Sequence, residues 1–424
     1  MSVQALQEAA PSGQDGYPLK SLLVGKAVEG IARQGIRNMP MRAIAANAGV
    51  TTAAIVHHFG DKSGLLRAAL QQALAEDTAF HERLSAEIAG RPLGYLNFVE
   101  WTANYIRLRH GSDNARFWSE VLFHPQAVAG NLRHVEAWHD MRVRAWGDIL
   151  EGQGRDRSFA EALVTYLCME EVWAQGLDSF AEYPILQRET LRALLAAMFD
   201  LSWDEEHSIS ALLEPRLESF AMRAPPNPDD LRERLLTEAA RDLFEHGIEK
   251  VNQRRIAGNL GVSPSIIAYH FGGMSNFRNQ AMWRAMIHKV ADPLNPYSAK
   301  DKPLTLEDWA EGMANAISPA DGSGDNGFYV SFARTIGEVA LLSGREPELL
   351  PLVEHLRILD GTASYQAGRG IWAAGLVSLR RQQASAFAMW MKGRAVLNTA
   401  FGYDRASTRK ALIEAVTRLI RPAG

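Results

Sequence analysis

One phrase of the sequence is written twice, and the two copies lie half of the chain apart. IVHHFGDKSGLL begins at Ile55 and IAYHFGGMSNFR begins at Ile267, an offset of 212 in a chain of 424 residues. At this offset, residues 22–70 align with residues 234–282 without a gap. The identical positions are mostly small, apolar or turn-forming, as a shared backbone requires. We therefore interpret the two segments as copies of one structural unit.

Each copy predicts three short helices. In the first copy, apolar residues at helical spacing run up to Gly35, a second segment ends at Gly49, and a third follows Thr51 as its N-cap. In the second copy Ser263 is the expected cap and Pro264 is the expected first helical residue, where proline has no N–H to lose. Two helices joined by a short Gly-containing turn form a helix-turn-helix. The spacing alone is weak evidence, and its occurrence twice in a three-helix context is much stronger.

The remaining sequence predicts further helices and no alternating strands, so we expect an all-α fold. The Pro- and Asp-rich stretch 221–230 is typical of a linker between domains. The last helix pair of each half, about 158–201 and 378–421, is expected to pack into a four-helix interface. The expected domains are a flexible tail (1–17), a first helix-turn-helix domain (18–66), a first helical regulatory domain (67–213), a linker (214–230), a second helix-turn-helix domain (231–278) and a second helical regulatory domain (279–424).

Charge is distributed unevenly along the chain. The net charge is −4, but residues 20–70 hold seven basic and two acidic residues, whereas residues 229–289 hold nine basic and seven acidic residues. The first copy is therefore suited to a polyanion, and the second copy less so. No apolar run is long enough to span a membrane and no signal peptide is evident, so we expect a cytoplasmic protein. The single cysteine, Cys168, cannot form an intramolecular disulfide and is expected in the core.

Two stretches carry a family resemblance: MRAIAANAGVTTAAIVHHFGDKSGLL and RRIAGNLGVSPSIIAYHFGGMSNF. Both resemble the DNA-binding signature of the TetR family of bacterial transcriptional regulators. The resemblance implies a sequence-specific DNA-binding regulator, often a repressor that a small ligand releases. Members of the family normally carry one such domain per chain and bind DNA as homodimers. Here both protomers are expected in one chain, as a covalent pseudo-dimer on a pseudo-palindromic or asymmetric duplex operator.

The resemblance also implies DNA contacts. The recognition helices are expected to begin at Thr51 and Ser263, and neither carries an Arg, Asn or Gln able to make a bidentate base contact. Specificity from base contacts should therefore be modest, with DNA shape contributing. The phosphate-binding Tyr of the family corresponds to Tyr269, and its helix-start Lys corresponds to Lys62. The expected contact residues are Arg42, Thr51, Thr52, Ala53, His57 and Lys62 in the first copy, and Arg254, Arg255, Ser263, Pro264, Ser265 and Tyr269 in the second.

The resemblance also implies an effector pocket in the helical regulatory domains. An apolar or aromatic ligand is expected there. Most aromatic residues of helical domains are core, so each candidate also has a purely structural interpretation. The candidate lining residues are Trp101, Tyr105, Trp118, Trp138, Trp173, Trp309, Phe332 and Trp372.

Other functions remain open at this point. No nucleophile–base pair or metal-ligand cluster emerges from the sequence, so we expect no enzyme activity, no cofactor and no metal. A helical interaction or small-molecule-binding protein with a degenerate second DNA reader is the alternative. Footprinting on a specific duplex separates it from a regulator. Whether the chains themselves dimerise is not decided by the sequence.

Overall fold

The structure is a computed structural model in which every described element is a helix. It describes residues 16–37, 40–202, 207–217, 227, 229–248, 251–288, 305–318, 327–362, 364–365 and 379–419. The expected flexible tail lies outside these residues except for its last two, which already belong to the first helix. The described part of the chain contains no strand, in agreement with the expected all-α class.

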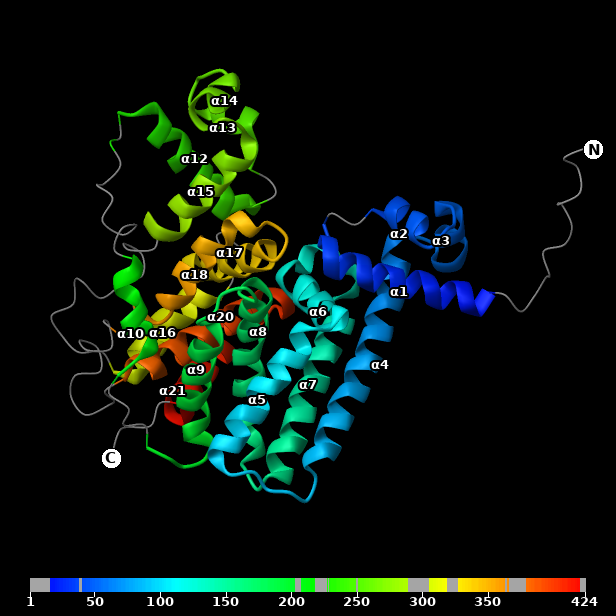
Figure 1. Cartoon of the computed structure of the whole chain (residues 1–424), viewed down its shortest axis with the longest axis vertical. Coiled ribbons are helices and arrows are strands. Elements are labelled where there is room, and N and C mark those ends of the chain that lie inside the picture. The colour runs from blue at the N-terminus through cyan, green and yellow to red at the C-terminus, as the bar shows by residue number, and fades with distance from the viewer. Residues whose placement is uncertain are drawn as a thin grey trace, which may run out of the picture.

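The first half forms a three-helix unit followed by a bundle of longer helices (Figure 1). Helix α4 joins the two without a break, so the expected boundary after residue 66 falls inside a helix. The elements are α1 (Gly16–Gln34), α2 (Met41–Asn47), α3 (Thr52–Phe59), α4 (Lys62–Ile88), α5 (Tyr95–His110), α6 (Asp113–Phe123), η1 (Pro125–Asn131), α7 (Leu132–Gly152), η2 (Arg157–Phe159), α8 (Ala160–Gly176), α9 (Tyr183–Met198), α10 (Ile209–Leu213) and η3 (Glu214–Leu217).

The second half follows the same order of parts. Its helix α15 continues across the expected boundary after residue 278, as α4 does in the first half. The described elements are α12 (Leu231–His246), α13 (Gln253–Asn259), α14 (Ser265–Phe271), α15 (Met274–His288), α16 (Leu306–Ile317), α17 (Phe328–Ser343), η5 (Pro347–Leu349), α18 (Leu350–Ile358), α20 (Arg381–Phe401) and α21 (Arg405–Leu419).

The helices α1–α3, here the first unit, and α12–α14, here the second unit, keep the register of the sequence repeat. Helices α2 and α13 begin and end at positions related by the repeat, as do the starts of α4 and α15. Three glycine pairs at the repeat positions share a positive φ, which favours glycine because a Cβ would clash. They are Gly35 and Gly247 (φ +87° and +89°), Gly49 and Gly261 (+70° and +68°), and Gly60 and Gly272 (+79° and +72°).

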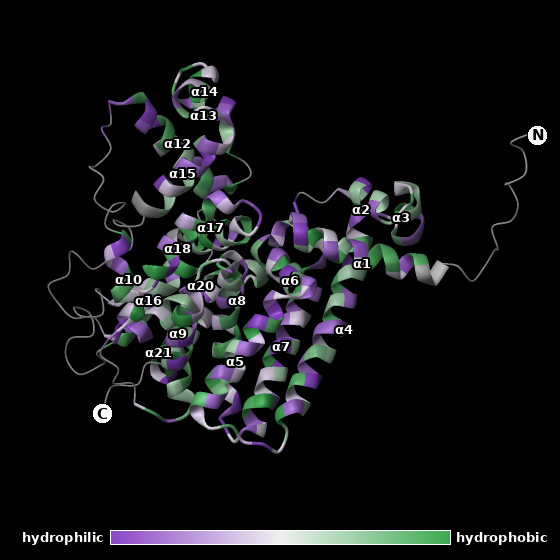
Figure 2. Cartoon of the chain, in the orientation of Figure 1, coloured by the Kyte–Doolittle hydropathy of each residue, from purple (hydrophilic) through white to green (hydrophobic). Residues whose placement is uncertain are grey.

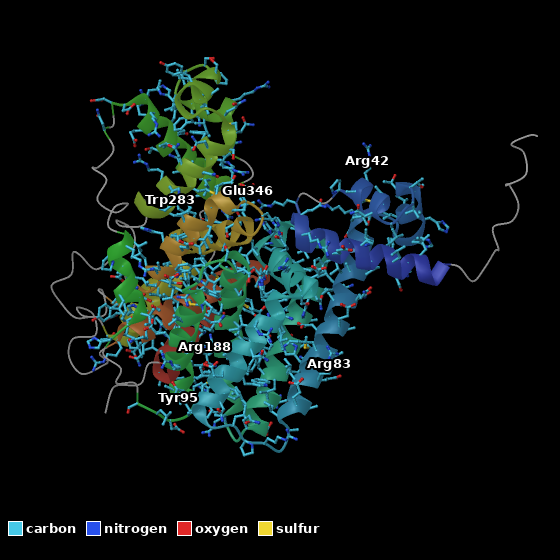
Figure 3. The ribbon with its side chains drawn as sticks, in the orientation of Figure 1. Arg42, Arg83, Tyr95, Arg188, Trp283 and Glu346 are labelled. Atoms are coloured by element: carbon cyan, nitrogen blue, oxygen red, sulfur yellow. The ribbon has the colours of Figure 1, made fainter. Side chains whose placement is uncertain are left out.

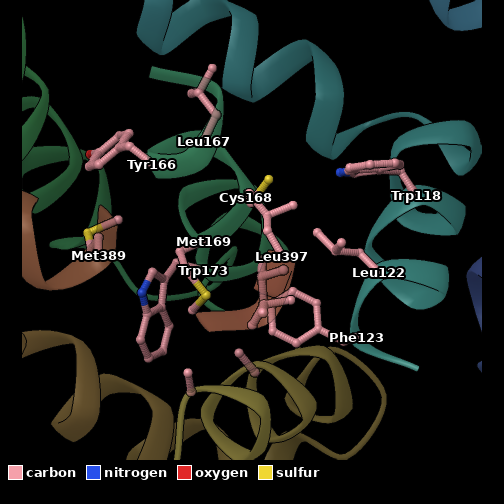
Figure 4. Close-up of a cluster of buried hydrophobic side chains, with 14 of the residues drawn as sticks. Trp118, Leu122, Phe123, Tyr166, Leu167, Cys168, Met169, Trp173, Met389 and Leu397 are labelled. Carbon is pink, nitrogen blue, oxygen red and sulfur yellow. The ribbon is translucent and has the colours of Figure 1, made fainter. Parts of the chain in front are cut away.

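The long helices of the body bury one face each. Figure 2 shows hydrophobic and hydrophilic residues alternating along α4, α5 and α7, the pattern of helices with one buried face. The buried faces of both halves join into one continuous apolar cluster. Figure 4 shows part of it, where Phe123 of α6 lies beside Leu397 of α20, and Trp173 of α8 lies across the cluster from Trp118 of α6.

The two halves meet along α8, α17 and α20. Helix α20 packs against α8 and α9, and α21 contacts α9. Glycines allow the backbones to approach: a Cβ on Gly393 of α20 would overlap the carbonyl oxygen of Thr165 in α8. A Cβ on Gly176 would come within 2.6 Å of the carbonyl oxygen of Ala340 in α17. Helices α8, α9, α20 and α21 fall in the two expected pairs, whereas α17, which also contacts α8, was not expected at this interface.

The two three-helix units attach to this body differently. The buried residues of the first unit are continuous with the main apolar cluster. Much of the second unit instead has a small cluster of its own, built around Leu235, Ile256, Ile267 and Phe271. In Figure 1 the second unit projects above the body, with α13 and α14 at its far end, and it lies apart from the first unit. Contacts at the base of α12 and α15 therefore decide how the second unit is held.

Candidate nucleic-acid interface

The turn between α2 and α3 is set by Gly49. Its positive φ reverses the chain after α2, and the N–H of Val50 donates to the carbonyl oxygen of Ala45 at 3.0 Å. Ile44 of α2 and Ile55 of α3 are buried against α1 and α4. Because these residues fix the inner faces of the two helices, the opposite face of α3 is directed to solvent.

That outer face carries the residues expected to contact DNA. Thr51, Thr52, Ala53 and His57 are all exposed. Thr51 occupies the N-cap position with extended dihedrals (φ −88°, ψ 160°), as expected, but its side chain makes no capping hydrogen bond. Its hydroxyl is therefore available to an external partner. Arg42 at the start of α2 is exposed too, and Figure 3 shows it projecting away from the helical body.

The start of α4 provides a cation beside a helix N-terminus. Lys62 is the first residue of α4 and is exposed. The preceding Asp61 caps the helix, accepting a 2.7 Å hydrogen bond from the N–H of Gly64. A phosphate placed here would meet both the ammonium group of Lys62 and the positive end of the helix. Helix α15 begins instead with Met274, which supplies no charge.

The interface depends on a position that the sequence alone did not reveal. A Cβ on Gly64 would overlap the carbonyl oxygen of Phe59, so α3 and α4 approach closely only because residue 64 has no side chain. The repeat places Asn276 at this position of the second unit, and its Nδ2 donates to the carbonyl oxygen of Phe271 at 2.8 Å. The close approach of the third and fourth helices thus depends on the missing side chain of Gly64 in the first half. In the second half, a side-chain hydrogen bond from Asn276 joins the corresponding helices.

Helix α14 starts one residue later than expected. Pro264, not Ser263, takes the N-cap position, and the helix begins at Ser265. Pro264 nevertheless has helical dihedrals (φ −55°, ψ −28°), as expected for a first helical residue, so the difference from the prediction is one residue in the helix bounds. The Ser263 hydroxyl instead lies 2.9 Å from the hydroxyl of Ser265, and both serines are exposed.

Tyr269 is the most prominent side chain on α14. It is 82% exposed, although tyrosine usually buries much of its ring. Its ring packs edge-on against His270, with centroids 5.1 Å apart. Its place in the repeat is that of His57, whose ring packs edge-on against His58 at the same 5.1 Å. Both units therefore present an aromatic hydrogen-bonding side chain at the same point of the third helix.

The two arginines expected to bind phosphate in the second unit differ in their surroundings. Arg254 is exposed on the first turn of α13. Arg255 forms a two-point ion pair with Asp242 of α12, with its Nε and Nη2 donating at 2.8 and 2.7 Å. The side-chain hydrogen bond to Asp242 is the main cause of the raised pKa of Arg255. Asp242 is one of the seven acidic residues in the segment 229–289, and a helical-wheel comparison of α12 and α13 could have suggested its pairing with Arg255.

Helices α1 and α12 differ in charge at positions related by the repeat, although Arg241 of α12 takes the position of Glu29. A hollow of about 310 Å³ on the first unit is lined by Lys26, Glu29, Gly30, Arg33, Gln34 and Asn47. At the repeat positions of Lys26, Gly30 and Arg33, the second unit has Glu238, Asp242 and Glu245. The acidic replacements explain the smaller basic excess that the sequence of the second copy shows.

The candidate pocket residues lie within the helical body. Tyr105, Trp118, Trp138 and Trp173 are completely buried, Trp309 and Phe332 are buried at 5% and 6% exposure, and Trp101 is half-buried. Trp372 lies outside the described residues. The rings pack on one another: Trp118 lies 5.1 Å from Trp138 between centroids, and Tyr105 lies 4.9 Å from Trp146. These contacts fit core packing, and a ligand role for the residues remains a prediction.

A buried charge network connects the four helices around Tyr105. Arg109 of α5 pairs with Asp77 of α4 and with Glu171 of α8, and Arg142 of α7 pairs with the same Glu171. Arg142 also donates to the Tyr105 hydroxyl at 3.0 Å. Burial is the main cause of the raised Tyr105 pKa, about 12. Because the two arginines and two carboxylates compensate each other, the network ties α4 to the rest of the bundle.

Two further searches bear on function. Over the residues whose structure is described, no group of three or more His, Cys, Asp or Glu side chains is arranged to hold a metal ion. In the same part of the chain, no helix has both the length and the apolar character needed to cross a bilayer.

Comparison with known proteins gives one family. No curated protein matches the chain. Residues 23–69 match the family described as "Bacterial regulatory proteins, tetR family", and the matched segment runs from within α1 through α2 and α3 into α4. This match supports a relationship of the chain to the tetR family and indicates a helix-turn-helix, DNA-binding transcriptional regulator.

Proposed function

We propose that the chain binds one duplex operator with both three-helix units and acts as a covalent pseudo-dimer. The observation that carries the proposal is the shared register of the units: α2 and α13 have equivalent bounds, and the turns after them use Gly49 and Gly261 at nearly the same φ. A duplicated backbone with an exposed third helix in each copy is what a two-fold DNA reader needs.

The packing of the body supports the same proposal. Helix α20 contacts α8 and α9, so the last helices of the two halves pack together within one chain. In two-fold regulators such helices join separate protomers. The two third helices would then enter successive major grooves, about 34–36 Å apart for one helical turn of DNA.

The two half-sites are expected to be bound unequally. The first unit offers Arg42, Lys62 and a third helix with His57, whereas the second offers Arg254 and Tyr269 and holds Arg255 on Asp242. Fewer free cations in the second unit mean weaker phosphate attraction there. We therefore propose an asymmetric operator.

A ligand response is the second part of the proposal. The buried network of Asp77, Arg109, Arg142 and Glu171 links α4 to α5, α7 and α8, and α4 starts in the first unit. An apolar or aromatic effector that separates these helices would move α4 and release the operator, which makes the protein a repressor. Operator binding measured with and without a panel of small aromatic compounds tests this part by itself.

The alternative is a helical interaction or small-molecule-binding protein whose second unit no longer reads DNA. The Arg255–Asp242 pair and the uncharged Met274 favour this alternative over an equal pair of readers. Selection of bound duplexes from a random pool, followed by footprinting, separates the two. Protection of two half-sites supports the pseudo-dimer, protection of one supports a degenerate second unit, and recovery of no preferred duplex contradicts both DNA-binding versions.

A further inference from the structure

We propose that two consecutive residues after α17, Arg345 and Glu346, hold the first and second units at a fixed separation. The inference rests on the proposed function for its consequence, which is the spacing of the two half-sites. The contacts themselves involve both units and the body that joins them. Arg345 and Glu346 act through other residues, so they are positioning residues rather than DNA contacts.

Arg345 reaches the first unit. Its Nε donates to the carbonyl oxygen of Arg33, in the last turn of α1, at 3.0 Å. Its Nη2 pairs with Glu120 of α6, and Glu120 accepts a 3.0 Å hydrogen bond from the N–H of Ile36. A Cβ on Gly35 would come within 2.9 Å of Nη1 of Arg345, so the guanidinium lies directly against the end of α1.

Glu346 reaches the helix that supports the second unit. It pairs with Arg278 of α15, the helix that packs along α12 and supports the second unit. Figure 3 shows Glu346 at the junction between that unit and the body. The N–H groups of Arg345 and Glu346 donate to the carbonyl oxygen of Leu342 at 2.9 and 2.8 Å, which fixes the turn. Because the two residues are adjacent in a fixed turn, a shift of one unit is passed to the other.

A second set of contacts links α17 to segments of both halves through the carboxylate of Glu338. Glu338 of α17 accepts from the N–H of Ile248, at the end of the second unit's α12, at 3.5 Å. The same carboxylate lies 3.5 Å from Nη2 of Arg37, which follows α1 of the first unit. His124 lies between the two carboxylates, with Nε2 3.8 Å from Glu338 and Nδ1 3.4 Å from Glu120.

The two carboxylates thus have matching roles. Each accepts from the backbone N–H two residues after the last helical residue of α1 or α12, and each contacts an arginine from the other half of the chain. Burial raises the pKa of Glu120, but His124 and Arg345 outweigh burial and lower it to about 2. Glu120 is therefore charged at neutral pH and needs these partners.

Helix α17 is held rigidly enough to act as the link. A Cβ on Gly337 would overlap the ring of Phe123 in α6, so these two helices are in close contact. On another side of α17, the hydroxyl of Ser343 donates to the carbonyl oxygen of Gly176 in α8 at 3.1 Å. A helix fixed against both α6 and α8 cannot yield independently when one unit moves.

The inference is tested by the distance between the two units in the absence of DNA. The chain has a single cysteine, Cys168, which is buried, so added surface cysteines are labelled selectively. Val56→Cys and Ala268→Cys place spin labels at equivalent exposed positions of α3 and α14. Pulsed electron resonance then gives the distribution of the distance between the labels. The parent protein is expected to give one narrow distribution.

Arg345→Ala and Glu346→Gln are each expected to broaden this distribution at least twofold. The charge-swapped pair Glu346→Arg with Arg278→Glu is expected to restore its width, which a merely structural loss would not do. Arg188→Ala is the matched control, because it removes an exposed ion pair to Glu100 away from both units and should change nothing. Glu346→Gln covers the case in which Arg345→Ala fails to fold.

Unchanged distance distributions in folded Arg345→Ala and Glu346→Gln overturn the inference.

A DNA-binding measurement uses the duplex selected for the parent protein, with one or two base pairs inserted between the half-sites. The parent is expected to lose at least tenfold in affinity on insertion, and the two variants are expected to lose less than threefold. If no duplex is selected, the proposed function fails while the distance measurement still decides whether the two residues hold the units.

Discussion

Arg255 and Asp242 form a two-point ion pair between α13 and α12, with donor–acceptor distances of 2.8 and 2.7 Å. The first unit has Ala43 and Gly30 at the repeat positions, so this pair belongs to the second unit alone. The carboxylate of Asp242 thus engages Arg255, the arginine that the sequence predicts as a phosphate contact. The pair has a direct consequence for DNA binding.

Asp242→Asn is expected to strengthen duplex binding, because it releases Arg255 from its ionic partner. The slope of log affinity against log salt concentration should become steeper by about 1 if the freed arginine binds one phosphate. The matched control is Asp242→Asn in an Arg255→Ala background, which should leave the slope unchanged. A salt titration that shows no difference between Asp242→Asn and the parent rules out this effect of the pair.

Lys62→Ala is expected to reduce duplex affinity at low salt and to make the salt slope shallower by about 1, because one ammonium–phosphate contact is lost. Met274→Lys is the reciprocal change, since Met274 begins α15 as Lys62 begins α4. It should restore a cation to the second unit and steepen the slope by a similar amount. An unchanged slope in both variants would show that the starts of α4 and α15 do not contact DNA.

Gly64→Ala is expected to destabilise the protein by about 1–3 kcal/mol, because the new Cβ would overlap the carbonyl oxygen of Phe59. Gly25→Ala is the matched control: no atom of the described residues lies within 4 Å of its Cβ position, and it sits inside α1. There alanine is expected to stabilise by about 0.5–1 kcal/mol. Thermal unfolding of both variants measures the contrast, and equal midpoints would show that α3 and α4 do not meet at residue 64.

The buried side chain of His139 is expected to make the folded protein less stable at acidic pH. It is buried between Trp118 and Phe401, and neither ring nitrogen has a hydrogen-bond partner among the described residues, with the Glu161 carboxylate 3.9 Å from Nε2. Burial lowers its pKa to about 3, with Arg142 and Arg394 adding to the effect. The unfolded chain binds this proton near pH 6.5 and the folded chain does not, so stability falls as the pH drops from about 6.5 towards 3. The loss is at most about 1.4 kcal/mol per pH unit for this group.

His139→Phe is expected to remove that part of the acid sensitivity while keeping the aromatic contacts. Unfolding midpoints of the variant and the parent, compared at pH 7 and pH 5, give the measurement. The difference between the two proteins should favour the variant more strongly at pH 5 than at pH 7. Identical pH dependence would mean that the imidazole is not held neutral in the folded protein.

Much of the local structure could be predicted from the sequence repeat. Glycines that require a positive φ, such as Gly49 and Gly261, recur at a fixed offset and identify where the helices end. The start of α14 differs by one residue from the prediction, because Pro264 has helical dihedrals but lacks the N–H of a regular helical residue. Lys62 begins α4, as the resemblance implies, and Met274 begins α15 at the repeat position.

Contacts between distant segments could not be predicted in this way. Ile36 and Glu120 are 84 residues apart, and Arg345 is 225 residues from Glu120, so no local periodicity connects them. The aromatic residues Tyr105 and Trp138 were expected around a ligand, but their polar atoms bond to Arg142 and Asp77 inside the bundle. A sequence pattern identifies an aromatic residue, and only the packing of several helices identifies its partners.

The central claim is that one chain supplies both halves of the DNA reader. Native mass spectrometry of the complex with the selected duplex measures it directly, because it counts chains and duplexes together. We predict one chain on one duplex, with footprinting showing two protected half-sites. An obligate dimer of chains with a single DNA site for each pair would contradict the account.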